Sequence, residues 1–553
     1  MMCWMKGGAA AVAVLLAAGC ANLAPRDGLA GSTAHVVAEP GFSAQRLSDH
    51  IKVLAADEFA GRFPGEVGET LTLDYLQAQY EAMGLLPGGP DGQWRQPVDL
   101  VRFTPLRAPT AAWSAAGERH ALTAGSDINL RARSDDGQVN LAGAPLVFAG
   151  YGVVAPERGW DDYGAVDLSG KVVLILAGQP AAFGADPNFY GSTEHKLAEA
   201  YRRGALGVVT LNEAGPSDPA WQRAVRGGGR PRMTTAGQAG VRFTGSINRS
   251  VAEAMTAATG QDLSAWLAAA KAGGAFKAAE TGLSLDVDIA ETTQTVRSHN
   301  LLAKIPGTRR PDEYLIYSAH WDHVGKADQP DASGDDIYNG AWDNASGTAG
   351  VMEMARAFKA GPPPERTVVF LHVTAEEQGL LGSEWYGDHP VYPLARTAAD
   401  INIDMLPFTP ASRNIAIFGL GKTTLEDDLA ALATAQGGRV LSGDGQPEEG
   451  FYYRSDHFNF AVHGVPALMP WTGTDLVDGG EAVGRPYYQR QMAAYYHKLD
   501  DEWRADYDFS AALQNLQLLY QLGQRVANSR AWPQWKPGAE FVGVRAETAA
   551  ARR

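Results

Sequence analysis

Hydrophobic positions in the second half of the chain form short, almost continuous runs that alternate with helical segments. A helical segment from Ala345 to Lys359 stops at GPPP, residues 361–364, as helices do before proline. Apolar strands with intervening helices predict an α/β fold, a mostly parallel sheet sandwiched between helices. The runs that predict its strands are EYLIYSA (313–319), RTVVFLHVTA (366–375), DINIDML (400–406) and VPALMPW (465–471).

The first hundred residues show a helical period instead. Apolar residues recur at three- and four-residue spacing from Ala44 to Leu54 and again from Thr70 to Met83, which predicts two helices. Between them lies DEFAGRFPGEVGE, residues 57–69, whose glycines and proline predict a loop.

Between about 130 and 285 the pattern changes to short β-like runs around one helical stretch, which predicts a small inserted module of mixed strands and helices. The Thr-rich ETTQTV at 291–296 marks its downstream border. We therefore expect six parts: a signal peptide (1–19), a tether (20–40), the first part of the main domain (41–135), the inserted module (136–285), the main domain (290–530) and a C-terminal tail (531–553).

The first twenty residues predict export. A start containing Lys6 precedes ten small or apolar residues, Ala9 to Ala18, a run too short to span a bilayer. The following LLAAGC, 15–20, resembles a bacterial lipobox, although Ala17 stands where Leu is commonest. We expect cleavage before Cys20 and lipidation of its thiol, which would anchor the protein in the bacterial cell envelope, at the outer membrane or periplasmic face. The alternative is a secreted or soluble periplasmic protein cut a residue or two later.

Charge and cysteine content narrow the chemistry. With 47 Lys and Arg against 63 Asp and Glu, the net charge is −16, which repels phosphate backbones, so we expect no nucleic-acid partner. The two cysteines are Cys3 and Cys20, and neither would be left as a free thiol after cleavage and lipidation. Any metal must then be held by histidines and carboxylates.

Such side chains follow the predicted strands. In open α/β sheets ligands bind beyond the carboxyl ends of the strands, so these groups are expected to converge. They are His320 and Asp322 after 313–319, Asp343 in NGAWDNASG, Glu376 and Glu377 after 366–375, and Asp404 within 400–406, with His497 in YYHKLDDE able to close the set.

Imidazoles and carboxylates without sulfur suit zinc or a similar divalent ion. Five ligands exceed the needs of one tetrahedral ion, whereas two ions that share one carboxylate would use all five and support amide or ester hydrolysis. Glu376 and Glu377 are adjacent and point different ways, so one can bind metal while the other takes a proton from water.

At this point the chain resembles the M28 zinc peptidases, co-catalytic metallo-aminopeptidases with the zinc exopeptidase fold. The resemblance runs from about 299 to 525 and is supported by DEFAGRFPG and TLTLDYLQAQYEAMGLLPGG between 41 and 100. Residues 136–240, with GYGVV, DDYGAVDLSGKVVLIL and HKLAEAYRRGALGVV, look like the protease-associated (PA) domain inserted in many of these enzymes.

The resemblance implies a role for each matched position. His320, Asp343 and Asp404 match the ligands of one zinc ion, and Asp343, Glu377 and His497 match those of a second. Glu376 matches the general base, Asp322 an acid that orients a ligand imidazole, and Tyr496 a tyrosine that hydrogen-bonds the intermediate. Arg454 and His457, in RSDHFNF, are candidates for the substrate cleft, whereas His323, His389 and His463 match no role and His372 is expected to be a buried structural residue.

The function expected from this resemblance is hydrolysis of peptides from one end, most simply by a di-zinc aminopeptidase. A carboxypeptidase, or another amide hydrolase such as the single-zinc relatives that cyclise N-terminal glutamine, could use the same scaffold. A non-catalytic receptor is the remaining alternative, since some relatives of this architecture lack working metal sites. Those relatives have lost ligands that this sequence keeps.

Overall fold

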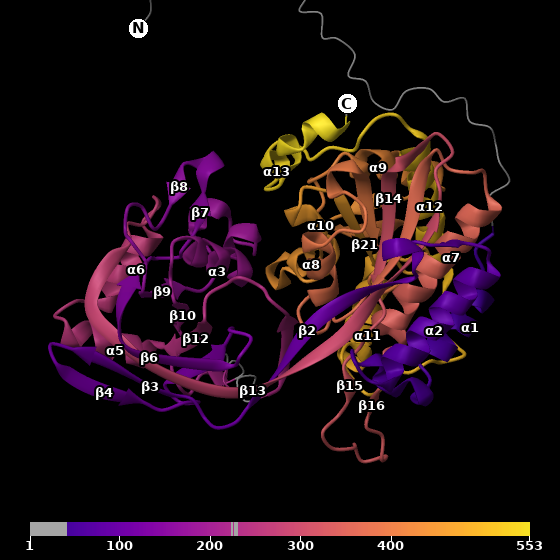
Figure 1. Cartoon of the computed structure of the whole chain (residues 1–553). Helices are drawn as coiled ribbons and strands as arrows, with labels where there is room; N and C mark the ends of the chain where they lie inside the picture. The colour runs from indigo at the N-terminus through magenta and orange to yellow at the C-terminus, as the bar shows by residue number, and fades with distance from the viewer. Residues whose placement is uncertain (1–40, 220, 223–224, 226–229, 553) are drawn as a thin grey trace, which may run out of the picture. The chain divides into compact units, whose positions relative to one another are not determined.

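The computed structural model describes residues 41–219, 221–222, 225 and 230–552 (Figure 1). The expected signal peptide, Cys20 and the tether therefore lie outside the described residues. The described residues belong to one compact unit. Among the described residues, no helix combines the length and the apolar character needed to cross a bilayer.

The main sheet has four parallel strands at its centre, as the apolar runs predicted. β17 (Arg366–Val373), β14 (Arg310–His320), β18 (Thr397–Asn402) and β21 (Ala467–Trp471) lie side by side in this order. Antiparallel pairs extend both sides. β21 pairs with β19 (Asn414–Phe418), which pairs in parallel with β20 (Val440–Ser442). On the other side β17 pairs with β13 (Ala279–Ile305), which also pairs with β1 (Leu86–Pro87) and β2 (Arg95–Pro105), and β2 pairs with β11 (Arg232–Thr235).

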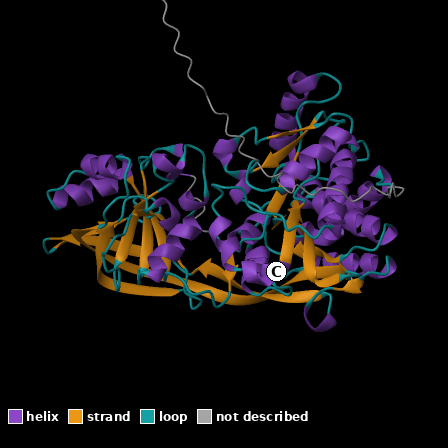
Figure 2. Cartoon of the chain, turned by 90° about the horizontal axis from the view of Figure 1, so that it is seen from above, coloured by secondary structure: helices purple, strands orange, loops and turns teal. Residues whose placement is uncertain are grey.

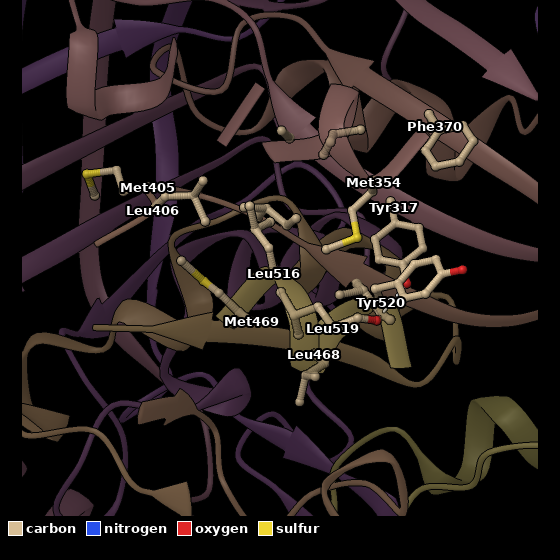
Figure 3. Close-up of a cluster of buried hydrophobic side chains, with 14 of the residues drawn as sticks. Tyr317, Met354, Phe370, Met405, Leu406, Leu468, Met469, Leu516, Leu519 and Tyr520 are labelled. Carbon is tan, nitrogen blue, oxygen red and sulfur yellow. Dashed lines mark hydrogen bonds between the residues drawn. The ribbon is translucent and has the colours of Figure 1, made fainter. Parts of the chain in front are cut away.

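Helices cover both faces of this sheet, which confirms the predicted sandwich. Alternate residues of the central strands face opposite layers: Tyr317 packs with α7 and α12, whereas Ile316 packs with α8 and α10. Figure 3 shows Tyr317 and Phe370 from the sheet beside Met354 of α7 and Leu519 of α12. The helices of the first layer are α1 (Ala44–Leu54), α2 (Val67–Ala82), α7 (Gly347–Ala360), α9 (Leu425–Ala435) and α12 (Ser510–Asn528); those of the second are α8 (Leu381–Asp388) and α10 (His457–Val462).

The N-terminal helices follow the sequence pattern closely. α1 has the predicted bounds, and the side chain of Ser43 caps it by accepting a hydrogen bond from the backbone N–H of Arg46. α2 begins three residues earlier than predicted. The expected loop between them is partly helical, because Asp57–Arg62 forms a 3-10 turn that ends with Gly61 and Arg62 in the left-handed region.

The inserted module is built on a second sheet. Its strands follow the order β4 (Glu118–Leu122), β3 (Thr110–Ala115), β13, β6 (Gln138–Phe148), β9 (Val172–Leu176), β10 (Gly207–Asn212), β12 (Phe243–Asn248) and β5 (Ile128–Ala132). Helices α3 (Thr193–Arg202), α5 (Arg249–Ala258) and α6 (Leu263–Lys271) accompany it.

The pairing of these strands differs from the division expected at residue 135. β3, β4 and β5 precede residue 135 and belong to the second sheet, whereas β11, inside the expected module, pairs with β2 of the main sheet. β13 belongs to both sheets: residues 279–290 pair with β3 and β6, and residues 291–305 pair with β2 and β17 (Figures 1 and 2).

The residues expected to form a C-terminal tail are packed against the main domain. Trp535 and Phe541 are buried in the first helical layer's core, and the short helix α13 (Val542–Glu547) follows them. Arg545 is buried and donates a hydrogen bond to the backbone oxygen of Thr397.

Candidate metal centre

The expected ligands converge where the central strands end. His320 is the last residue of β14, Asp404 follows β18 by two residues, and Asp343 lies four residues before α7. Glu377 follows β17 by four residues, and His497 comes from the segment after α11 (Gly480–Tyr495). Parallel strands bring their carboxyl ends to one edge of the sheet, which explains why residues so far apart in sequence meet here.

The first group consists of His320, Asp343 and Asp404, all buried. The Nε2 atom of His320 lies 3.2 Å from Oδ1 of Asp404 and 3.4 Å from Oδ1 of Asp343. Its Nδ1 atom lies 3.2 Å from the backbone oxygen of Asp322. Because a carbonyl oxygen only accepts hydrogen bonds, Nδ1 carries the proton in neutral His320, which leaves the Nε2 lone pair facing the carboxylates.

The second group forms around the other oxygen of Asp343. Nε2 of His497 lies 3.2 Å from Oδ2 of Asp343 and 3.1 Å from Oε2 of Glu377. Asp343 thus presents Oδ1 to one group and Oδ2 to the other. A single carboxylate shared in this way is the arrangement that a pair of neighbouring divalent ions requires.

The electrostatics agree with a centre built for cations. Burial raises the pKa of Asp343, but hydrogen bonds from His320 and His497 outweigh that effect and hold this pKa well below its ordinary value. Burial lowers the pKa of His497, but its hydrogen bonds to Asp343 and Glu377 raise it to about 10. Three carboxylates and two imidazoles, without sulfur, fit zinc or a similar divalent ion.

Glu376 lines the same cavity beside these groups and differs from them electrostatically. Burial raises its pKa well above the ordinary value, and the carboxylates of Asp404 and Glu377 add to that effect against the opposing charge of His320. A carboxylate with a raised pKa accepts a proton more readily at neutral pH. Of the two adjacent glutamates, only Glu377 contacts His497.

Asp322 connects the ends of two strands. Its fully buried carboxylate accepts hydrogen bonds from the backbone N–H of Glu376 (3.1 Å) and of Glu377 (3.4 Å), and its Oδ1 lies 3.7 Å from Nδ1 of His320. The resemblance to the M28 peptidases implied that Asp322 contacts the imidazole of a metal ligand. The structure adds that the same carboxylate fixes the backbone of both glutamates.

The other expected site residues divide into two sets. Tyr496 and Arg454 line the cavity, and the Tyr496 ring stacks on His497 with 4.0 Å between ring centroids. His457 is not among the residues that line it: its side chain is fully buried in α10, and burial lowers its pKa to about 3. This corrects the expectation that His457 lines the cleft, because its ring points into the packed interior beside Tyr452.

Three residues that hold the centre together were not assigned by the sequence. Nδ1 of His323, which matched no role, lies 2.6 Å from Oε1 of Glu377, and His323 also groups with Asp343 and Glu377 as a possible metal site. Asp501 accepts hydrogen bonds from the backbone N–H of Trp342 (2.8 Å) and Asp343 (3.0 Å). The available signals were the proximity of these residues to His320 and His497 in sequence, since His323 follows His320 by three residues and Asp501 follows His497 by four.

Arg62 is the third of these residues and explains the DEFAGR segment. Its buried guanidinium donates hydrogen bonds to the backbone oxygens of Trp321 (2.9 Å), Leu54 (2.7 Å) and Gly340 (2.8 Å). These carbonyls belong to α1, to the loop that follows His320 and to the loop that carries Asp343. Arg62 therefore joins the N-terminal helices to the metal centre.

The cavity over this centre has a volume of about 740 Å³ and is lined by residues of the main domain and of the inserted module. The main domain contributes the metal-centre residues, Tyr453 and Phe458, and the inserted module contributes residues of α3 and its flanks, among them Phe189 and His195. Gln238 Nε2 of the module donates to Glu384 of α8 at 2.8 Å, and Phe189 contacts Phe541 with ring centroids 5.4 Å apart.

Fold and site together define an α/β protein with an imidazole and carboxylate centre at its strand ends, and comparison with known proteins agrees. Residues 300–521 match peptidase family M28. Aminopeptidase YwaD of Bacillus subtilis is 28% identical over 288 residues, which cover 51% of this chain and 49% of that protein. A probable glutamate carboxypeptidase of Arthroderma benhamiae is 30% identical over 234 residues, 38% of this chain and 27% of that protein.

Among solved structures, the aminopeptidase from Aneurinibacillus sp. strain AM-1 superposes with a TM-score of 0.48 at 21% identity, covering 88% of this chain and 94% of that one. The similarity to peptidase family M28 lies in residues 300–521. The chain spans about half, or less, of the length of the two curated relatives described above.

Proposed function

We propose that the protein is a di-zinc exopeptidase, and specifically an aminopeptidase. The observation that carries this proposal is the position of the Asp343 carboxylate, whose two oxygens face two separate ligand groups. His320, Asp343 and Asp404 would hold one ion, and Asp343, Glu377 and His497 the other. The match of residues 300–521 to peptidase family M28 and the names of relatives such as aminopeptidase YwaD support peptide hydrolysis by such a centre.

The zinc ions, when bound, would lower the pKa of a water molecule and polarise the scissile carbonyl. Glu376 takes the proton of the attacking water, for which its raised pKa suits it, and then delivers that proton to the leaving amine. Asp322 keeps Glu376 in place through its backbone N–H. Tyr496, at the cavity wall, would donate a hydrogen bond to the oxyanion that develops on the carbonyl.

We propose further that the inserted module, a PA-like domain, limits the cavity to peptide ends and short peptides. The support is that Phe189 and His195 of the module line the same cavity as Glu376. A long folded substrate would have to displace these side chains to bring an internal bond to the centre.

The experiment is mass spectrometry of a defined peptide pool after incubation with the purified protein, with a chelator-treated aliquot alongside. Ladders shortened from the N-terminus, present without chelator and absent with it, are expected. Ladders from the C-terminus, or hydrolysis that survives N-acetylation, would replace the aminopeptidase with the carboxypeptidase that the name of the Arthroderma benhamiae relative suggests. A pool left intact by zinc-loaded protein would overturn both.

The metal content tests the remaining alternative. A non-catalytic receptor on this scaffold would bind no divalent ion after purification and take none up on addition. We expect about two zinc ions per chain, as five ligands with one shared carboxylate imply.

We also propose that the protein is exported and anchored by a lipidated Cys20, on the strength of LLAAGC at 15–20 alone. The test is expression of the full chain and of Cys20→Ala in a Gram-negative host, followed by fractionation and mass analysis of the N-terminus. The wild-type chain should appear in the membrane fraction with an acylated N-terminal cysteine. Recovery of an unmodified N-terminus in the soluble fraction would favour the secreted alternative.

A further inference from the structure

The cavity over the metal centre contains one arginine that has no partner in the described part of the chain. Three arginines line this cavity: Arg133, Arg202 and Arg454. Arg133 pairs with Glu194 at 3.0 Å, and Arg202 pairs with Glu199. Arg454 is exposed and makes neither an ion pair nor a side-chain hydrogen bond with any residue that the structure describes.

The guanidinium of Arg454 is nevertheless held in place. Its Cζ atom lies 5.0 Å from the centroid of the Phe451 ring, and Phe451 lines the same cavity. The backbone N–H of Arg454 donates to the backbone oxygen of Phe451 at 3.1 Å. A guanidinium stacked on an aromatic ring keeps its N–H groups free to point toward a ligand.

The backbone of Arg454 is also tied to the metal centre. The next residue, Ser455, is buried, and its hydroxyl donates to Oδ2 of Asp404 at 2.6 Å and accepts a hydrogen bond from Asn402 at 2.7 Å. The backbone of Arg454 is thus directly joined to Ser455, which contacts the expected ligand Asp404. The side chain of Arg454 lines the cavity that Glu376 and Tyr496 also line.

The chemistry of this position favours an anion. The protein carries a net charge of −16, and most of the charged side chains that line the cavity are carboxylates, so an arginine without an acidic partner stands out among them. The planar guanidinium matches a carboxylate with two parallel hydrogen bonds, which lysine cannot reproduce. In a peptide, such a carboxylate is either the C-terminal group or the side chain of an aspartate or glutamate.

We propose that Arg454 binds a carboxylate of the substrate, so that the enzyme prefers peptides that carry a carboxylate close to the scissile bond. This inference rests on the proposed peptidase function and makes it more specific. Arg454 would then determine specificity, whereas Glu376 and the metal ligands carry out the chemistry.

The test compares kcat/KM for matched peptides with the zinc-loaded protein. One pair is a dipeptide and its C-terminal amide, and a second pair is two peptide amides that differ by glutamate or glutamine next to the scissile bond. The wild type should prefer the charged member of at least one pair by about tenfold or more, as expected for a good charge-assisted contact. The pair that shows the preference identifies which carboxylate is bound.

Arg454→Gln should abolish this preference mainly through a higher KM for the charged peptide, and Arg454→Lys should restore it only in part. Arg202→Gln is the matched control, because Arg202 lines the same cavity but pairs with Glu199, and it should leave the preference unchanged. Circular dichroism and zinc content establish that each variant is folded and loaded.

Two results would overturn the inference. The first is that the wild-type enzyme cleaves the charged and the uncharged peptide of each pair equally well. This result can be observed without any variant. The second is that Arg454→Gln lowers kcat/KM equally for the charged and the uncharged peptide of a pair. In either case peptides are still cleaved, so the proposed peptidase function stands, whereas absence of any chelator-sensitive cleavage would count against the peptidase itself.

Discussion

At the scale of single residues, the backbone turns sharply beside each part of the metal centre. Ala375, Met405 and His497 are not glycines, yet they have φ values of 54°, 59° and 54°, in the left-handed region. Such conformations cost of order 1 kcal/mol or more each and persist where surrounding contacts impose them. Met405 is held by a hydrogen bond from its N–H to Oδ1 of Asn344 at 3.0 Å.

These turns direct the neighbouring side chains. Ala375 immediately precedes Glu376 and Glu377, and Met405 immediately follows Asp404. A strand that continued straight would carry the next side chains along the sheet instead of over its edge. The left-handed residues therefore help to aim the carboxylates toward one point.

The first prediction concerns Glu376, the proposed base. Glu376→Gln keeps the shape of the side chain but removes its capacity to accept a proton, so kcat should fall by about 10²- to 10⁴-fold. Zinc content, measured by plasma mass spectrometry, should stay at the wild-type level because Glu376 is not among the expected ligands. A variant that retains most of its kcat would exclude Glu376 as the base.

The second prediction concerns His323, which contacts Glu377 through Nδ1. Removing this contact with His323→Ala should weaken zinc binding at the second group by about 10- to 100-fold, as loss of a residue that orients a ligand does. The measurement is a competitive zinc titration against a coloured chelator. His323→Asn, whose amide can donate from nearly the same place, should recover much of the affinity.

The control for that titration is His389→Ala. His389 is exposed, stacks on Trp385 and belongs to neither ligand group. Equal losses in the two alanine variants would show that His323 has no particular role at the centre.

At the scale of elements, the segment after α11 is bound to the loop before α7. The backbone oxygen of Asp501 accepts from the N–H of Ala341 at 3.0 Å, and its carboxylate accepts from the N–H groups of Trp342 and Asp343. His497 and Asp343 both contribute to the second ligand group, so these three hydrogen bonds fix the separation of its two sides.

The third prediction follows from this connection. Asp501→Ala leaves two buried backbone N–H groups without a partner, at about 1 to 3 kcal/mol each, and should lower the free energy of unfolding accordingly. It should also weaken zinc binding at the second group more than at the first. Urea unfolding and zinc titration measure the two effects.

Asp500→Ala provides the comparison, because Asp500 is the exposed neighbour in the same turn. It should change neither quantity by more than about 0.5 kcal/mol, as is usual for exposed positions. If Asp501→Ala behaves in the same way as Asp500→Ala, the connection contributes nothing to the centre.

At the scale of the whole molecule, three histidines outside the metal centre are buried in neutral form. Burial lowers the pKa of His195 to about 4 and the pKa values of His372 and His457 to about 3. Between those values and about 6.5 the unfolded chain binds protons that the folded chain does not. The contribution of these three histidines to stability therefore rises with pH across this range and falls on acidification.

The fourth prediction isolates one of these contributions. His457→Phe keeps an aromatic ring beside Tyr452 but cannot be protonated, so its free energy of unfolding should lack the part that rises with pH between about 4 and 6.5 because of His457. The slope should differ from that of the wild type by up to about 1.4 kcal/mol per pH unit. Urea unfolding at several pH values measures both slopes, and identical slopes would show that His457 is not buried in neutral form.

The sequence was most informative where structure depends on local pattern. Continuous apolar runs predicted the four central strands, and the rule for strand ends brought His320, Glu377 and Asp404 together. The contact of Asp501 with the loop at Asp343 joins residues 158 positions apart and depends on how two loops meet. No local pattern encodes such a meeting.

β13 shows the same limit at the level of an element. Over 281–291 its residues alternate between buried and less buried, but from Glu291 to Thr295 they are all polar, so the sequence suggested a border there. The strand continues because β2 supplies an antiparallel partner from Glu291 to Leu301. Backbone pairing, and not side-chain pattern, determines structure across this stretch.

This shared strand also has a mechanical consequence. A flexible linker would let the inserted module rotate relative to the main domain. Here the connection is β13, one continuous strand that is hydrogen-bonded in both sheets. Bending it at residue 291 would break the ladder with β2. The opening of the cavity would then keep a constant width. The largest peptide that can enter should therefore not depend on how tightly that peptide binds.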